Sequence, residues 1–147
     1  MSRTQTLDRE VGRALPALSA AAKRGLGDPA PAELVMIRAS QINHCAFCLD
    51  MHLRPARENG ECEERIALLD AWEEAGDRYS GRERAAPALT EAVTVLTDGF
   101  VPDAVYDTAA KHFDQGELAR LIGLVAVVNG WSRLMVGRRI LPGGYRP

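Results

Sequence analysis

Residues 45–52 read Cys-Ala-Phe-Cys-Leu-Asp-Met-His, and no other stretch of this 147-residue chain is as informative. At about 100° per residue of helix, Cys48 lies about 60° and His52 about 20° from the direction of Cys45. All three side chains therefore share one stripe of a helix. Two thiols three residues apart can close a disulfide or hold a metal, and a histidine four residues further on can exchange a proton with the second thiol. The stretch predicts a redox or metal-binding site.

The composition of the whole chain is that of one helical domain. Hydrophobic residues make up 46% of the chain, which is enough for a core, and 147 residues are too few for two comfortable domains. Alanine, leucine, glutamate and arginine dominate, and apolar residues recur at helical spacing from end to end. We therefore expect an all-α protein with a single domain over residues 1–147.

Turn and capping residues divide the chain into helices. The expected helices cover about residues 7–23, 31–41, 43–59, 62–72, 80–97, 102–113 and 116–136. Asn43 is expected to end the second helix and to cap the third, and Ser80 with Glu83 fits a capping box. Pro55 and Pro87 each remove a backbone hydrogen bond, so each should kink or shorten its helix. The last and most apolar helix should be central to the core.

The charges indicate neither a nucleic-acid nor a membrane partner. Eighteen basic and 20 acidic residues are interspersed and give a formal net charge of -2. The strongly apolar stretch 121–128 is far shorter than the ~20 residues of a membrane span, and residues 1–6 lead into no signal-peptide core. We expect a cytoplasmic protein with small soluble partners. In that reducing compartment, a Cys-x-x-Cys pair is expected to be catalytic or metal-binding rather than structural.

The two thiols are expected to differ. Helix N-terminal amides favour a thiolate, so Cys45 should be the more acidic and accessible thiol, and Cys48 should be more buried. A thiolate can attack a peroxide O–O bond and leave a sulfenic acid, which the second thiol converts to a disulfide. His52 can relay the proton of Cys48. Glu33, on the preceding helix, can orient that imidazole or act as the base itself.

A zinc site is the alternative to a redox pair. The two cysteines with His52 and either Glu33 or His44 could supply four ligands. The chain has no second Cys-x-x-Cys or histidine pair to complete an ordinary zinc module, so redox chemistry is favoured and no metal or cofactor is expected. Cys62 has no apparent partner, and His112 is expected to be a surface or capping residue.

Several motifs in a fixed order carry a family resemblance. They are Glu33-Leu34-Val35, the run from Ser40 to Cys48, His52, Ala56-Arg57 with Gly60, Trp72, Glu83-Arg84-Ala85-Ala86, Glu91-Ala92-Val93-Thr94 and Asn129-Gly130-Trp131-Ser132-Arg133. With these motifs the chain resembles the carboxymuconolactone decarboxylase-like superfamily over about residues 10–137. It is specifically similar to the alkylhydroperoxidase D-like (AhpD-like) branch, which has a histidine four residues after Cys-x-x-Cys and a glutamate twelve residues before it.

The resemblance implies a compact, all-helical AhpD-like fold that forms homo-oligomers, commonly trimers or hexamers. It also implies a thiol-dependent peroxidase that takes a peroxide substrate and a dithiol or protein reductant. In that branch the second cysteine attacks the peroxide, the first resolves it, and the glutamate and histidine relay the proton. Carried over by motif, these residues are Cys48, Cys45, Glu33 and His52. The name-giving decarboxylases lack the cysteine pair, so the lactone reaction is not expected.

The chain departs from the family pattern at four positions. His44 stands where glycine is frequent, Ser132 stands where asparagine is frequent, and Pro55 and Pro87 interrupt helices that are usually continuous. These departures are expected to affect local geometry and subunit packing more than thiol chemistry. A general disulfide reductase, a redox-responsive partner and a zinc-stabilised oligomer without enzymatic activity stay open as alternatives.

Overall fold

The computed structural model describes residues 8–144, which form helices and no strand. The elements are α1 (Arg9–Lys23), α2 (Pro29–Ile42), α3 (Ala46–Glu58), α4 (Glu63–Leu68), the 3-10 helices η1 (Leu69–Glu74) and η2 (Gly76–Arg78), α5 (Gly81–Thr94), α6 (Asp103–Ala110) and α7 (Gln115–Arg138). The all-α prediction is confirmed. Residue 7, where the first helix was expected to begin, lies outside the described residues.

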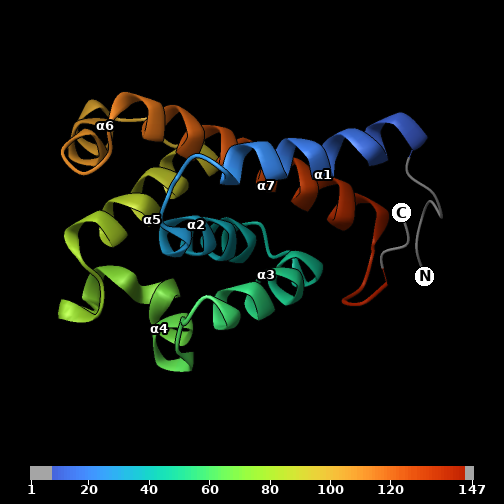
Figure 1. Ribbon diagram of the computed structural model, residues 1–147, viewed down its shortest axis with the longest axis horizontal. Coiled ribbons are helices and arrows are strands. Elements are labelled where there is room, and N and C mark those ends of the chain that lie inside the picture. Colours follow the sequence, from blue (N-terminus) through green and yellow to red (C-terminus); the bar gives the residue numbers. More distant parts are fainter. Residues whose placement is uncertain (1–7, 145–147) are drawn as a thin grey trace.

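α7 is the central helix of the core, as its apolar sequence predicts. It packs against α1, α2, α3 and α5, and Figure 1 shows α1 lying along it with α2 beneath the pair. By length and composition α7 could cross a membrane, but half of its most apolar window is buried inside the protein. Burial of that kind is what the core helix of a folded domain shows.

The prolines inside helices do not end them. α3 continues past Pro55 to Glu58, and α5 continues past Pro87, so the packing of each helix outweighs the lost backbone bond. A third interior proline, Pro16, lies within α1. α5 nevertheless ends at Thr94, three residues before the predicted end at Thr97, because the next residue leaves helical geometry.

Capping explains where two of the helices start. Ser80 accepts the Glu83 amide N–H while the Glu83 carboxylate accepts the Ser80 amide N–H, so the predicted capping box at the start of α5 is confirmed. Asp114 and Glu117 form a second box at the start of α7, which the sequence analysis did not identify. Both boxes satisfy amide groups that the first turn of a helix leaves unpaired.

The turn between α2 and α3 is the part of the fold that positions the thiols. The His44 N–H donates to the Gln41 carbonyl and the Cys45 N–H donates to the Ser40 carbonyl, each at 3.0 Å. This pair of bonds closes a Schellman motif, which needs a left-handed residue after the helix. His44 is that residue, with φ 51°, and this explains why glycine suits the position.

Asn43 ends α2 as predicted, but the prediction that it also caps α3 is wrong. Cys45 is the N-cap of α3, and its sulfur accepts the Cys48 amide N–H at 3.2 Å. The Asn43 side chain instead donates to the Asn129 side chain of α7 at 3.0 Å. The Schellman turn places two residues, His44 and Cys45, between Asn43 and the start of α3, so Asn43 is too far back to cap.

His44→Gly should raise the free energy of unfolding by about 0.5 to 1 kcal/mol. A left-handed conformation costs a non-glycine residue ~1–2 kcal/mol, which glycine avoids. The greater conformational entropy of glycine in the unfolded chain offsets ~0.5–1 kcal/mol of this stabilisation. Denaturant unfolding of the oxidised protein measures the change. Lys111→Gly is the control, because this exposed residue has φ -74° and its replacement should lower stability. A His44→Gly protein that is no more stable than the parent would contradict the argument.

Candidate functional site

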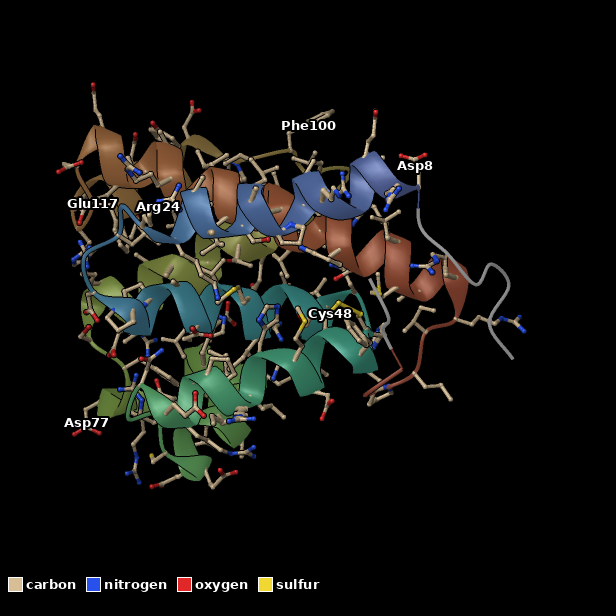
Figure 2. The ribbon with its side chains drawn as sticks, turned by 45° about the vertical axis from the view of Figure 1, so that its right-hand side comes forward. Asp8, Arg24, Cys48, Asp77, Phe100 and Glu117 are labelled. Carbon is tan, nitrogen blue, oxygen red and sulfur yellow. A yellow bond between two sulfur atoms is a disulfide. The ribbon has the colours of Figure 1, made fainter. Side chains whose placement is uncertain are left out.

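Cys45 and Cys48 are joined by a disulfide at the start of α3, with their Cα atoms 5.3 Å apart. Figure 2 shows Cys48 where α3 faces α7. The two residues are only 1% and 0% exposed, so the expectation that Cys45 is accessible is wrong. The cause is the packing of α7 on the first turn of α3. The covering side chains are Phe47 of α3 and Val127, Trp131 and Met135 of α7.

Each sulfur has a hydrogen-bond donor of its own. The Cys48 amide N–H donates to the Cys45 sulfur at 3.2 Å, and the Ser132 hydroxyl donates to the Cys48 sulfur at 3.6 Å. In the reduced protein such donors favour a thiolate over a thiol. Ser132 is 84 residues from Cys48 in the chain, and the sequence marked it only as a departure from the family pattern.

His52 lies one helical turn beyond Cys48 and is 6% exposed. Burial and, to a smaller extent, the positive charge of Lys23 together lower its pKa from 6.5 to about 4. Its Nε2 atom is buried and forms no hydrogen bond with any residue that the structure describes. The imidazole is therefore neutral at neutral pH, and its Nε2 atom is available for a hydrogen bond or a transient proton transfer.

Glu33 comes from α2, where it is 5% exposed. Burial raises the pKa of its carboxyl group, while the charge of Lys23 and a hydrogen bond from Asn59 counteract part of that rise. Lys23 Nζ lies 3.9 Å and Asn59 Nδ2 lies 3.5 Å from Glu33 Oε1, and Oε2 has no partner within residues 8–144. Within the same residues no hydrogen bond joins Glu33 to His52, so the expected direct orientation of the imidazole by Glu33 is absent.

Lys23 is a member of this cluster that the sequence analysis did not identify. It is the last residue of α1, and its charge affects both His52 and Glu33. A lysine at a helix C-terminus is common, because it interacts favourably with the helix dipole, so its sequence position carries no functional signal. Only the packing of α1 along α7 brings Lys23 over α2 and α3.

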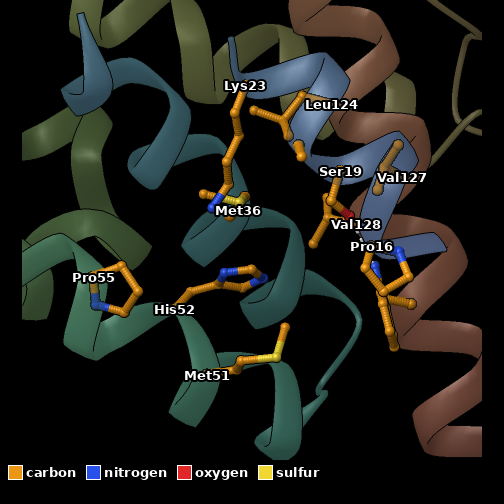
Figure 3. Close-up of a pocket in the computed structure, with 12 residues that line it drawn as sticks. Pro16, Ser19, Lys23, Met36, Met51, His52, Pro55, Leu124, Val127 and Val128 are labelled. Carbon is orange, nitrogen blue, oxygen red and sulfur yellow. Dashed lines mark hydrogen bonds between the residues drawn. The ribbon is translucent and has the colours of Figure 1, made fainter. Parts of the chain in front are cut away.

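A pocket of about 450 Å³ opens between α1, α2, α3 and α7 beside this cluster (Figure 3). Nine of its 12 lining residues are apolar, and the other three are Ser19, Lys23 and His52. The volume lies within the ~300–1,000 Å³ range of small-molecule sites. The two sulfurs do not line the pocket. His52, one helical turn beyond Cys48, lines it, and so do Val127 and Trp131, which pack in the same cluster as the two cysteines.

The remaining candidate residues lie apart from this site. Cys62 is a free, exposed cysteine at the start of α4, and His112 is exposed, as the sequence predicts for a surface residue. No group of three potential metal ligands among His, Cys, Asp and Glu occurs within residues 8–144. The ligand set considered for zinc is therefore not assembled there, since the two thiols bond to each other and His44 is exposed.

Known proteins resemble this chain across the helices that carry the site. The Carboxymuconolactone decarboxylase family model matches residues 9–92. The uncharacterized protein YdfG of Bacillus subtilis is 42% identical over 104 residues, which cover 71% of this chain and 70% of YdfG. The uncharacterized protein YnjA of Escherichia coli is 33% identical over 108 residues, 73% of this chain and 58% of YnjA.

A solved structure extends the resemblance to the whole fold. ATU0492 from Agrobacterium tumefaciens, a protein of unknown function that has been proposed as the antioxidant defence protein AhpD, matches with a TM-score of 0.86. The two chains are 32% identical, and the match covers 90% of each. The AhpD-like fold predicted from the motifs is thereby confirmed.

His52 should make the protein less stable in mild acid. Its pKa is 6.5 in the unfolded chain and about 4 in the folded protein, so between these values the unfolded chain binds the extra proton. The contribution of His52 to the free energy of unfolding should fall by about 2 kcal/mol from pH 7.5 to pH 5. The pKa of Glu33 shifts in the opposite direction, so Glu33 also contributes to the pH dependence of stability. The variants compared must therefore all keep Glu33.

The measurement is urea unfolding across this pH range for the parent, His52→Gln and the exposed control His112→Gln. The His52→Gln protein should lose less stability in acid than the other two, whatever its stability at pH 7.5. Parallel pH profiles for all three proteins would contradict the argument.

Proposed function

Because the chain belongs to the carboxymuconolactone decarboxylase family, within its AhpD-like branch, we propose that it is a thiol-dependent peroxidase that works through a Cys45–Cys48 disulfide cycle. The observation that carries the proposal is the disulfide one helical turn from a buried, neutral histidine. A neutral imidazole in that position can take the proton of a thiol, which is the step that makes cysteine a nucleophile.

The proposed cycle consumes one hydroperoxide and one dithiol. The Cys48 thiolate attacks the hydroperoxide ROOH and the O–O bond breaks. Cys48 keeps the OH group as a sulfenic acid, and the alkoxide takes up the proton that the thiol gave up and leaves as ROH. The Cys45 thiol then displaces water from that sulfur and closes the disulfide. A dithiol donor supplies two electrons and two protons, restores both thiols and becomes a disulfide itself.

The shifts of Glu33 and His52 support a role for both in proton transfer. Burial raises the pKa of Glu33 and lowers that of His52 to about 4, so the two groups depart from their ordinary order, in which histidine is clearly the stronger base. Both groups can then take part in passing on the proton that Cys48 gives up. Since no direct hydrogen bond joins the two groups within residues 8–144, the transfer needs a bridging group such as water or the substrate.

Burial of the sulfurs favours a peroxidase over a general protein disulfide reductase. Thiol–disulfide exchange requires a thiolate to approach one sulfur of the bond directly, and sulfurs in residues that are 0–1% exposed are out of reach of a protein partner while α3 stays packed on α7. A small peroxide needs far less space. Reduction of the disulfide then calls for a slender dithiol, or for movement of α3 away from α7.

We also propose that the protein acts in the cytoplasm as a homo-oligomer, a trimer or a hexamer. Large apolar side chains stay exposed on several elements, among them Leu18, Phe100, Val136 and Leu141, and assembly would cover such surface. Sedimentation at micromolar concentration should give a multiple of the 16.0 kDa chain mass. A species of 16.0 kDa alone would rule the oligomer out.

Cysteine variants test the cycle itself. With a dithiol donor the parent and Cys62→Ser should consume peroxide at equal rates, because Cys62 is exposed and has no disulfide partner. Cys48→Ser should be far slower, and Cys45→Ser should accumulate a sulfenic acid on Cys48 that mass spectrometry detects after trapping. Glu33→Gln and His52→Ala should each slow the peroxide step by roughly a hundredfold, the lower end of general acid–base effects.

Three results would count against this scheme. A sulfenic acid trapped on Cys45 in Cys48→Ser would reverse the roles of the two thiols. Unchanged rates in both Glu33→Gln and His52→Ala would refute the proton relay but leave the dithiol cycle standing. No peroxide consumption by the parent with any dithiol would refute the peroxidase.

A further inference from the structure

The pocket beside His52 is apolar inside and carries one positive charge. Leu124 and Val128 of α7 and Met36 of α2 form buried parts of its wall, whereas Lys23 and Met51 are partly exposed. No acidic side chain lines it. Figure 3 shows Lys23 extending from α1 toward His52 over this space. The pocket therefore offers an apolar interior and a cation near solvent.

Among the described residues that line the pocket, His52 and Lys23 are the polar side chains that form no hydrogen bond through Nε2 or Nζ. Ser19 is already engaged, because its hydroxyl accepts the Trp131 indole N–H and donates to the Leu15 carbonyl, each at 3.0 Å. His52 is more than nine-tenths buried and its Nε2 has no hydrogen-bond partner in the described part of the chain. Lys23 forms no hydrogen bond within residues 8–144 and lies 3.9 Å from Glu33.

The ammonium group of Lys23 is an incompletely satisfied cation. It has three N–H donors, and 3.9 Å to the Glu33 carboxylate is too long for a hydrogen bond. The side chain of Lys23 is 39% exposed, so a charged group can reach it without losing all of its hydration.

We propose that this pocket binds apolar carboxylates, with the chain of the ligand against Leu124 and Val128 and its carboxylate on Lys23. Lys23 is then a specificity-determining residue. If the protein is the peroxidase proposed above, hydroperoxides that carry a carboxylate are preferred over neutral ones. This consequence rests on the proposed function, whereas binding of the carboxylate does not.

Binding of decanoate to the oxidised protein, measured by isothermal titration calorimetry, tests the site without any peroxide. Lys23→Met should weaken binding about tenfold or more, because a hydrogen bond to a charged group contributes ~1.5–3 kcal/mol. Lys23→Arg keeps the charge and should keep most of the affinity. Arg24→Met is the matched control, since it removes a positive charge from the neighbouring exposed residue and should bind decanoate like the parent.

A neutral ligand of the same length separates charge recognition from apolar burial. The parent should bind 1-decanol more weakly than decanoate, and Lys23→Met should bind the alcohol as the parent does. No binding of decanoate by the parent, equal binding of acid and alcohol, or equal losses in Lys23→Met and Arg24→Met would overturn the proposal.

The substrate preference has its own readout. The ratio of kcat/KM for linoleate hydroperoxide to that for cumene hydroperoxide should fall about tenfold in Lys23→Met, and any effect on the shared chemistry cancels in that ratio. An unchanged ratio would overturn the preference. Inactivity of the parent toward both peroxides would count against the proposed peroxidase activity. The decanoate measurements would still show whether the pocket binds carboxylates through Lys23.

Discussion

Two hydrogen bonds at the end of α2 determine where the disulfide of this protein lies. They turn the chain at His44 and use the Cys45 N–H to close the Schellman motif, while the Cys45 sulfur caps the next helix. One residue thus ends α2, starts α3 and forms half of the disulfide. The 3.6-residue period of α3 then places Cys48 and His52 on the same side, against α7 and the pocket.

Burial controls the acid–base behaviour of the site. It opposes charge on Glu33 and on His52, and because one group is an acid and the other a base, their pKa values move in opposite directions. Lys23 favours ionised Glu33 and disfavours protonated His52. Burial and this lysine together keep the imidazole neutral at neutral pH.

The features that the sequence predicted depend on near neighbours in the chain. Helical periodicity and local hydrogen bonding explain the features that were predicted: the all-α class, the capping box of Ser80, and the position of Cys48 and His52 on one side of a helix. What the sequence did not predict depends on contacts across the fold. Cys45 is buried because α7 covers it, and Ser132 and Lys23 reach the site only through the packing of α7 on α3 and of α1 on α7. The tolerance of Pro87 within α5 has the same origin, since its side chain is buried in a packed helix.

The two helix-interior prolines next to the site, Pro16 and Pro55, both line the pocket, and so do the methionines Met36 and Met51. A proline ring has almost no side-chain conformational entropy to lose, whereas a methionine has three rotatable bonds and a polarizable sulfur. One part of the wall is therefore fixed before a ligand arrives, and another part can adjust to it. Ligands that differ in outline near the prolines will be discriminated by shape, while those that differ near the methionines will be accommodated.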